Sequence, residues 1–219
     1  YTQGRGFENA WLDVSAGAGR LDIGDMHQTF QEALVRVTYD SASHTARFTT
    51  FRITSPRIDG DLSGRIVIQP HNDKTGANMV IAYDFSGPRL RGNLADDYAP
   101  QTLTDAHFRG RYVPRDRRFR IDSGTGLLNG APLKTQGTLY TDDQGRLGAD
   151  LTAKIEGRFT KEEVFAFWPQ DLAPQTRHML IERIRQGDFA NADFTLKAPP
   201  GHFVADGLTN DALRLDFDF

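Results

Sequence analysis

The chain has 219 residues, a net charge of −3 and no cysteine. The missing cysteines exclude a disulfide scaffold, a thiolate metal site and a cysteine nucleophile, and the weakly negative charge leaves no electrostatic case for nucleic-acid binding. No apolar run approaches the roughly 18 residues of a membrane helix, and no signal peptide is visible. Because the chain begins at Tyr1 and ends in an alternating run, we expect a single segment, 1–219, of a longer repetitive protein.

Alternation of apolar and polar residues dominates the sequence and predicts β-strands with one apolar face, as in antiparallel sheets. Short strands are expected near 7–14 and 20–23, in the same sheet. Clear alternation follows at 33–39, 62–69, 79–85, 106–112, 147–155 and 213–219. Turn-forming residues separate these stretches, which indicates a meander of hairpins. Residues 89–104 have little pattern and are predicted to form a long loop.

One segment breaks the strand pattern. Thr160 and Glu163 form a capping box, which predicts a helix start at this point. A second helix should begin near Pro174, since proline suits the first helical position, and Gly187 should end it. The sequence therefore predicts one helical insertion, within 160–186, that caps one end of the sheet. Its apolar residues are expected to form the cap, with Trp168 packed on Phe159 or Phe189: Phe165, Trp168, Leu172, Leu180 and Ile184.

The strands outnumber the helices that could cover them. A flat sheet with one bare apolar face would aggregate, so the sheet must curl over or close. We predict a mainly β fold: a long, curled, antiparallel sheet, taco-like, with an apolar inner face. Whether that interior is an open groove or is filled by side chains stays open. The residues predicted to line it are Phe48, Ile66, Met79, Ile81, Phe85, Phe108, Tyr112, Phe119, Leu151 and Ile155.

Motifs for chemistry are few. The string Asp122-Ser123-Gly124-Thr125 resembles the active-site loop of aspartic proteases, but those enzymes need two aspartates that share a proton, and a second such string is missing. We interpret 122–126 as a glycine-rich turn after a strand at 119–121. The six histidines show no metal-ligand spacing. We therefore predict no catalytic residue, no metal and no cofactor.

Arginines gather near residue 115. On a hairpin, Arg109, Arg111, Arg118 and Arg120 would share one face, opposite the apolar residues between them. Such a face could meet lipid phosphates or an acidic partner. It is also compatible with an ordinary solvated strand face.

The helical segment carries a pattern found elsewhere: W-P-x-x-L-x-P-x-x-R, a short helix, I-x-x-G and a strand of small and apolar residues. The residues that carry it are Trp168, Pro169, Leu172, Pro174, Arg177, Ile184, Gly187, Ala192 and Leu196. This pattern resembles the AsmA-like superfamily, in its YhdP-type branch. The match spans 168–196, and the flanking strands agree with it in style.

The resemblance implies a large envelope protein of a Gram-negative bacterium, anchored in the inner membrane outside this segment. Its periplasmic part would be an elongated, curled β-sheet with an apolar groove, similar to bridge-like lipid-transfer proteins. Such proteins are implicated in moving phospholipid between the two membranes and in outer-membrane integrity. The expected partners are phospholipid or another acyl lipid and neighbouring segments of the same chain.

We therefore expect a non-enzymatic periplasmic segment that holds acyl chains in an apolar groove. Two alternatives stay open. One is a structural or adaptor domain of a cell-envelope protein, whose filled sheet binds another protein through an edge strand or the arginine face. The other is a hydrolase that uses Asp122.

Overall fold

The computed structural model describes residues 9–23, 26–69, 79–93, 99–166, 174–183, 189–202 and 212–218. The strands in the first half of this part are β1 (Asn9–Ala16), β2 (Gly19–Ile23), β3 (Met26–Phe30), β4 (Glu32–Asp40), β5 (Thr45–Thr54), β6 (Ile58–Gln69) and β7 (Val80–Gly92). The second half contains β8 (Gln101–Val113), β9 (Arg118–Leu128), β10 (Ala131–Thr141), β11 (Leu147–Phe159), α1 (Lys161–Ala166), α2 (Pro174–Arg183), β12 (Phe189–Ala198) and β13 (Leu213–Asp218).

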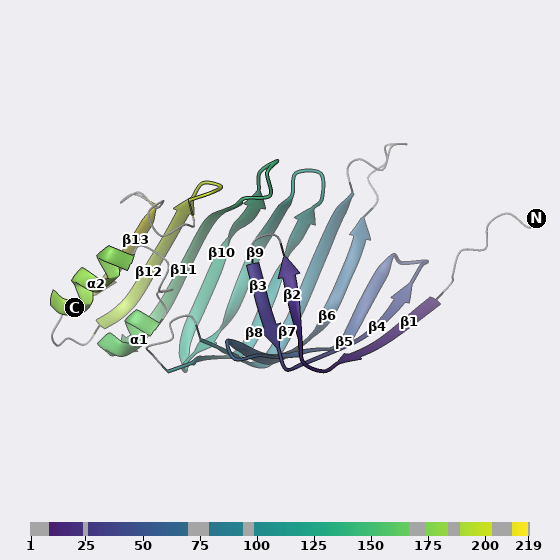
Figure 1. Cartoon of the computed structure of the whole chain (residues 1–219), viewed down its shortest axis with the longest axis horizontal. Helices are drawn as coiled ribbons and strands as arrows, with labels where there is room; N and C mark the ends of the chain where they lie inside the picture. The colour runs from purple at the N-terminus through teal and green to yellow at the C-terminus, as the bar shows by residue number, and fades with distance from the viewer. Residues whose placement is uncertain are drawn as a thin grey trace, which may run out of the picture.

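Eleven of these strands form one antiparallel sheet (Figure 1). Its order is β1-β4-β5-β6-β7-β8-β9-β10-β11-β12-β13, so neighbours in the sheet are also neighbours in sequence apart from β2 and β3. The sheet does not close into a barrel, because β1 and β13 stand at its two edges. This arrangement confirms the predicted fold class, a long curled antiparallel sheet with short helices.

Two predictions about the strands were wrong. The strand predicted near 20–23 is not in the main sheet: within the described residues β2 pairs with β3 alone, while the strand that pairs with β1 is β4. The region 89–104 is not one long loop either, since β7 runs on to Gly92 and β8 starts at Gln101. Leu90 lies opposite Leu103 in this extension. Pro88 is tolerated because the β6–β7 register is irregular there.

The strands bend where their register slips. Five irregular pairings lie toward the same end of the sheet, between Phe48 and Phe51, Gly60 and Ser63, Thr104 and His107, Ile155 and Arg158, and Ala190 and Asp193. Two of these sites use left-handed backbone at a residue other than glycine, Asp105 and Asn191. A bulge bends its strand and increases the local twist. A line of bulges across neighbouring strands therefore curls the whole sheet.

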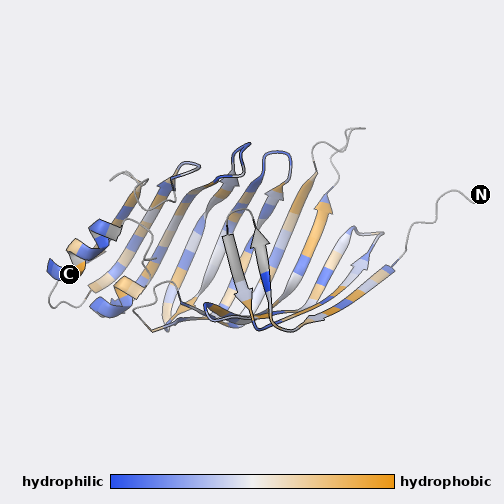
Figure 2. Ribbon diagram, viewed as in Figure 1, coloured by the Kyte–Doolittle hydropathy of each residue, from blue (hydrophilic) through white to orange (hydrophobic). Residues whose placement is uncertain are grey.

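Hydrophobic and hydrophilic residues alternate along many of the strands (Figure 2), so the two sides of the sheet differ in chemistry. One cross-strand row runs through Phe48, Gly64, Phe85, Phe108, Gly124, Thr135, Ala153, Phe194 and Leu215. We call the side that carries this row the apolar face. The adjacent row, on the opposite side, runs through Arg47, Arg65, Asp84, Arg109 and Ser123. We call that side the polar face.

Helix α1 covers one end of the apolar face. The predicted capping box is present: Glu163 N donates to Thr160 Oγ1 at 3.2 Å, and Thr160 N donates to a Glu163 carboxylate oxygen at 2.8 Å. This cap starts α1, and α2 starts at Pro174 as predicted. Val164 of α1 packs against β11 and β12 in a cluster with Ile155, Phe159, Phe189 and Ala192.

Candidate functional site

The apolar face contains an open hollow of about 560 Å³ over β6, β7, β8 and β9. Its lining is aliphatic or aromatic throughout: Leu62, Ile66, Ile81, Tyr83, Phe85, Phe108, Tyr112, Phe119 and Ile121. The volume lies within the roughly 300–1,000 Å³ of typical ligand sites, which are mostly apolar. This hollow is the candidate site.

Glycines let aromatic rings from alternate strands meet. Phe48 and Phe85 lie on strands separated by β6, yet their ring centroids are 5.5 Å apart. Gly64 stands between them in the register, where a Cβ atom would lie 2.8 Å from the Phe85 ring. The rings therefore converge over a position that has no side chain. This convergence forms a continuous aromatic surface on the apolar face.

Tyr83 is the most enclosed residue of the hollow, with 7% of its surface exposed. Its hydroxyl donates a hydrogen bond to the Arg120 carbonyl oxygen at 3.0 Å. Burial, with a smaller contribution from the charge of Asp122, raises the pKa of Tyr83 to about 12. The phenol therefore stays neutral at physiological pH.

Most residues predicted to line a groove lie at or beside this hollow. Ile66, Ile81, Phe85, Phe108, Tyr112 and Phe119 line it directly. Phe48 contacts it through Phe85, and Met79 is half-buried immediately before β7. Leu62, Tyr83 and Ile121 were missing from the prediction, although all three lie in alternating stretches or beside them.

Two predicted lining residues lie elsewhere on the apolar face. Leu151 packs against a cluster formed by Ala149, Leu196 and Ala198. Ile155 is buried in the cluster beneath α1, so it is a core residue and does not line the hollow. The apolar face is thus packed toward β11–β13, while the hollow lies over β6–β9.

The predicted helical cap is described only in part. Phe165 is 1% exposed and is one of the two largest fully buried side chains in the described residues. Trp168, Leu172 and Ile184 lie outside the described residues, and for Leu180 only its place in α2 is described. The packing of Trp168 on Phe159 or Phe189 therefore stays a prediction.

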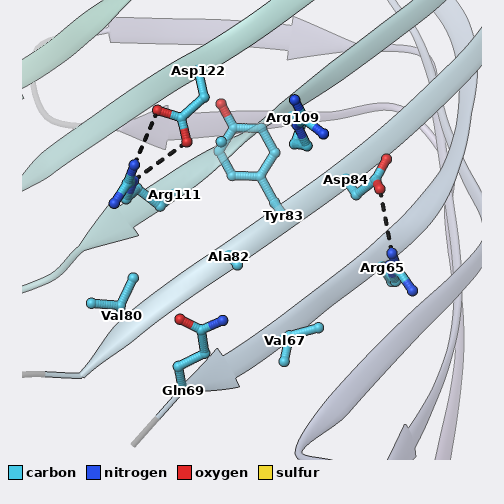
Figure 3. Close-up of a pocket in the computed structure, with 11 residues that line it drawn as sticks. Arg65, Val67, Gln69, Val80, Ala82, Tyr83, Asp84, Arg109, Arg111 and Asp122 are labelled. Atoms are coloured by element: carbon cyan, nitrogen blue, oxygen red, sulfur yellow. Dashed lines mark hydrogen bonds and ion pairs between the residues drawn. The ribbon is translucent and has the colours of Figure 1, made fainter. Parts of the chain in front are cut away.

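Asp122 does not lie in a turn, contrary to the prediction. It lies within β9, where Ile121 pairs with Gly110 and Ser123 pairs with Arg109, so Asp122 is the extra residue of a bulge. Its carboxylate projects on the polar face (Figure 3). It forms ion pairs with Arg120 at 2.6 Å and with Arg111 at 3.3 Å. A carboxylate held by two guanidinium groups differs from the shared-proton pair of an aspartic protease.

The predicted arginine face is present. Arg111 lies directly opposite Arg120 on the polar face, while Tyr112 and Phe119 form the next pair on the apolar face. Arg118 stacks over the ring of Tyr140 at 5.5 Å. The polar face is therefore charged and partly ion-paired, and it backs directly onto the hollow.

Within the described residues, no group of three or more histidine, aspartate or glutamate side chains is placed to hold a metal ion. In the same part of the chain, neither helix has the length and apolar character to cross a membrane. Comparison with protein-family models, curated proteins and solved structures gives no match for this chain.

Proposed function

We propose that the apolar face binds the acyl chains of lipids without catalysing a reaction. The observation that carries the proposal is the hollow over β6–β9, whose lining side chains are aliphatic or aromatic. Large apolar side chains remain partly in water there, with Phe119 38% exposed. A soluble domain that exposes such a surface has a partner for it, and a hydrocarbon chain matches its chemistry.

The energetics suit reversible binding. Each buried methylene is worth about 0.8 kcal/mol, so a few methylenes in the hollow give a substantial but reversible gain. No directional polar contact is needed. Eleven strands about 4.8 Å apart give a face about 50 Å long, and the part of it away from the packed clusters at β11–β13 offers successive apolar contacts to an acyl chain.

The likeness of residues 168–196 to the AsmA-like superfamily supports the same proposal. In that setting, the chain is a periplasmic segment of a larger protein anchored in the inner membrane. The segment then contributes part of a groove along which phospholipid moves between the inner and outer membranes.

Native mass spectrometry of the purified chain, followed by lipid extraction, tests the proposal. We expect a protein species with a bound phospholipid. Ile81→Asp should lose it, because a lone carboxylate is costly against an acyl chain. Ser86→Asp is the matched control, since Ser86 is exposed on the polar face of the same strand. Absence of lipid from the unmodified chain, or equal retention by both folded variants, would contradict the proposal.

Binding of another protein through a sheet edge is the second candidate function. The edge strand β1 exposes Trp11 (80%), Leu12 and Val14. Edge strands with free backbone groups are templates for pairing with another strand. A lipid-free protein that captures a partner, and loses it on Trp11→Ala and Val14→Lys substitution, would favour this function over lipid binding.

A further inference from the structure

A second hollow, of about 400 Å³, lies on the polar face behind the candidate lipid site. It is lined by Arg65, Val67, Gln69, Val80, Ala82, Tyr83, Asp84, Arg109, Gly110, Arg111 and Asp122. Figure 3 shows Ala82 and its neighbours between two charged groups, the Arg111–Asp122 pair on one side and the Asp84–Arg65 pair on the other. The hollow thus has an apolar floor and charged walls.

The two carboxylates of the hollow are already engaged. Asp84 lies 2.7 Å from His107 Nε2 and 3.6 Å from Arg65. Asp122 is held by Arg111 and Arg120. The hydrogen bond from His107, helped by the charges of Arg65 and Arg109, lowers the pKa of Asp84, so this group stays ionised near neutral pH.

Arg109 stands between these two ion-paired groups (Figure 3). Within the described part of the chain, its guanidinium group has no hydrogen bond and no ion pair within 4.0 Å. A guanidinium carries five N–H donors in a fixed fork. Arg109 therefore presents a full set of donors to the hollow.

The local charge is positive in a chain whose net charge is negative. Arg65, Arg109 and Arg111 line the hollow against two carboxylates, and Arg120 adds a fourth guanidinium through Asp122. In addition, Arg47 lies directly opposite Arg65 on the neighbouring strand. Like charges that face one another across strands are destabilising, and a bound anion would relieve that repulsion.

We propose that this hollow binds a phosphate group. Guanidinium forks match the oxygens of phosphate with paired, charge-assisted hydrogen bonds, and the volume suits a small ligand. The apolar floor of Val67, Val80 and Ala82 tolerates the hydrocarbon part of a phosphate ester. The ligand is either a lipid headgroup or a soluble phosphate compound. This site opens on the opposite face from the acyl-chain hollow. The two hollows share Tyr83, but the arginines that would bind phosphate line this site alone.

Two parallel binding assays test the proposal and identify the source of the phosphate. The first titrates inorganic phosphate at low ionic strength and follows the arginine Nε–Hε signals by NMR. The second measures co-flotation with vesicles of 30% phosphatidylglycerol in phosphatidylcholine, against phosphatidylcholine alone. Arg109→Gln is the test variant. Arg214→Gln is the control, because Arg214 lies on the same face at the far edge strand β13.

Binding of inorganic phosphate, weakened about tenfold by Arg109→Gln and unchanged by Arg214→Gln, supports a site for soluble phosphates. Co-flotation that requires phosphatidylglycerol, and that is reduced by Arg109→Gln, supports a site for lipid headgroups. Both results count as support only if the melting temperatures of the variants lie within about a degree or two of that of the unmodified chain. Arg65→Gln should weaken binding in the same way as Arg109→Gln. Failure of both probes to bind, or equal effects of Arg109→Gln and Arg214→Gln, would overturn the proposal.

Discussion

The ring of Tyr83 stacks on the ring of Phe119, with centroids 4.7 Å apart and planes 6° from parallel. These residues belong to β7 and β9, and β8 runs between those strands. Contact across the intervening strand is possible because Tyr83 lies opposite Gly110. The stack forms part of the lining of the hollow, so Gly110 helps to determine the shape of the candidate site.

Gly110→Ala should therefore destabilise the chain and change the hollow. A Cβ atom at this position would lie 2.6 Å from the Tyr83 hydroxyl oxygen and would also clash with the Arg120 carbonyl. Overpacking of this kind costs about 1–3 kcal/mol of unfolding free energy. Denaturant unfolding measures the loss.

Gly92→Ala is the matched control within β7. Among the described residues, no atom lies within 4 Å of a Cβ at Gly92, and its φ is not in the left-handed region. Alanine there should leave stability unchanged or raise it by up to about 1 kcal/mol. Equal effects of the two substitutions would show that the Tyr83–Phe119 stack does not depend on Gly110.

Phe165→Ala tests whether α1 is a structural cap of the apolar face. Phe165 is 1% exposed, and truncation of a fully buried phenylalanine costs about 3–5 kcal/mol. The measurement is again denaturant unfolding. Met179→Ala in α2 provides the comparison, because Met179 is 42% exposed and should change stability by less than about 1 kcal/mol. A loss below 1 kcal/mol for Phe165→Ala would mean that the helix is not part of the folded core.

Asp84 should make stability depend on pH. Its folded pKa is lowered from 3.8, chiefly by the hydrogen bond from His107. As the pH falls through 3.8 toward the lower folded pKa, the unfolded chain binds more protons than the folded chain does, so the free energy of unfolding decreases. The contribution is fully present above about pH 5. Asp84→Asn should reduce the unfolding free energy at pH 7 and reduce it less at pH 3. The same reduction at both pH values would contradict the assigned ion pair.

Local features of the fold were predictable from the sequence, because they depend on neighbouring residues. The Thr160–Glu163 capping box needs only four positions, and the alternation from 106 to 112 directly encodes two faces. Pairing and bulges depend on residues far apart in the chain. For that reason the strand near 20–23 was assigned to the main sheet, and the bulge at Asp122 was interpreted as a turn.

The sequence predicts which side chains belong to the apolar face, but it does not predict where on that face the hollow lies. Ile81 and Ile155 both occupy the apolar positions of alternating stretches, yet Ile81 lines an open hollow and Ile155 is buried beneath α1. Which strands the helices cover is a tertiary property that the alternation does not contain. Tyr83 was missed for a related reason, because its position in the hollow depends on Gly110 of the next strand.

Site-specific photo-crosslinking in cells tests the central claim most directly, since it asks which face touches lipid. A photoreactive phenylalanine analogue would replace Phe85 or Phe119 on the apolar face, and Ser86 or Thr125 on the polar face. Our account predicts lipid adducts at Phe85 and Phe119, and few or none at Ser86 and Thr125. Adducts only at Ser86 and Thr125, or at none of the four positions in folded protein, would contradict acyl-chain binding by the apolar face.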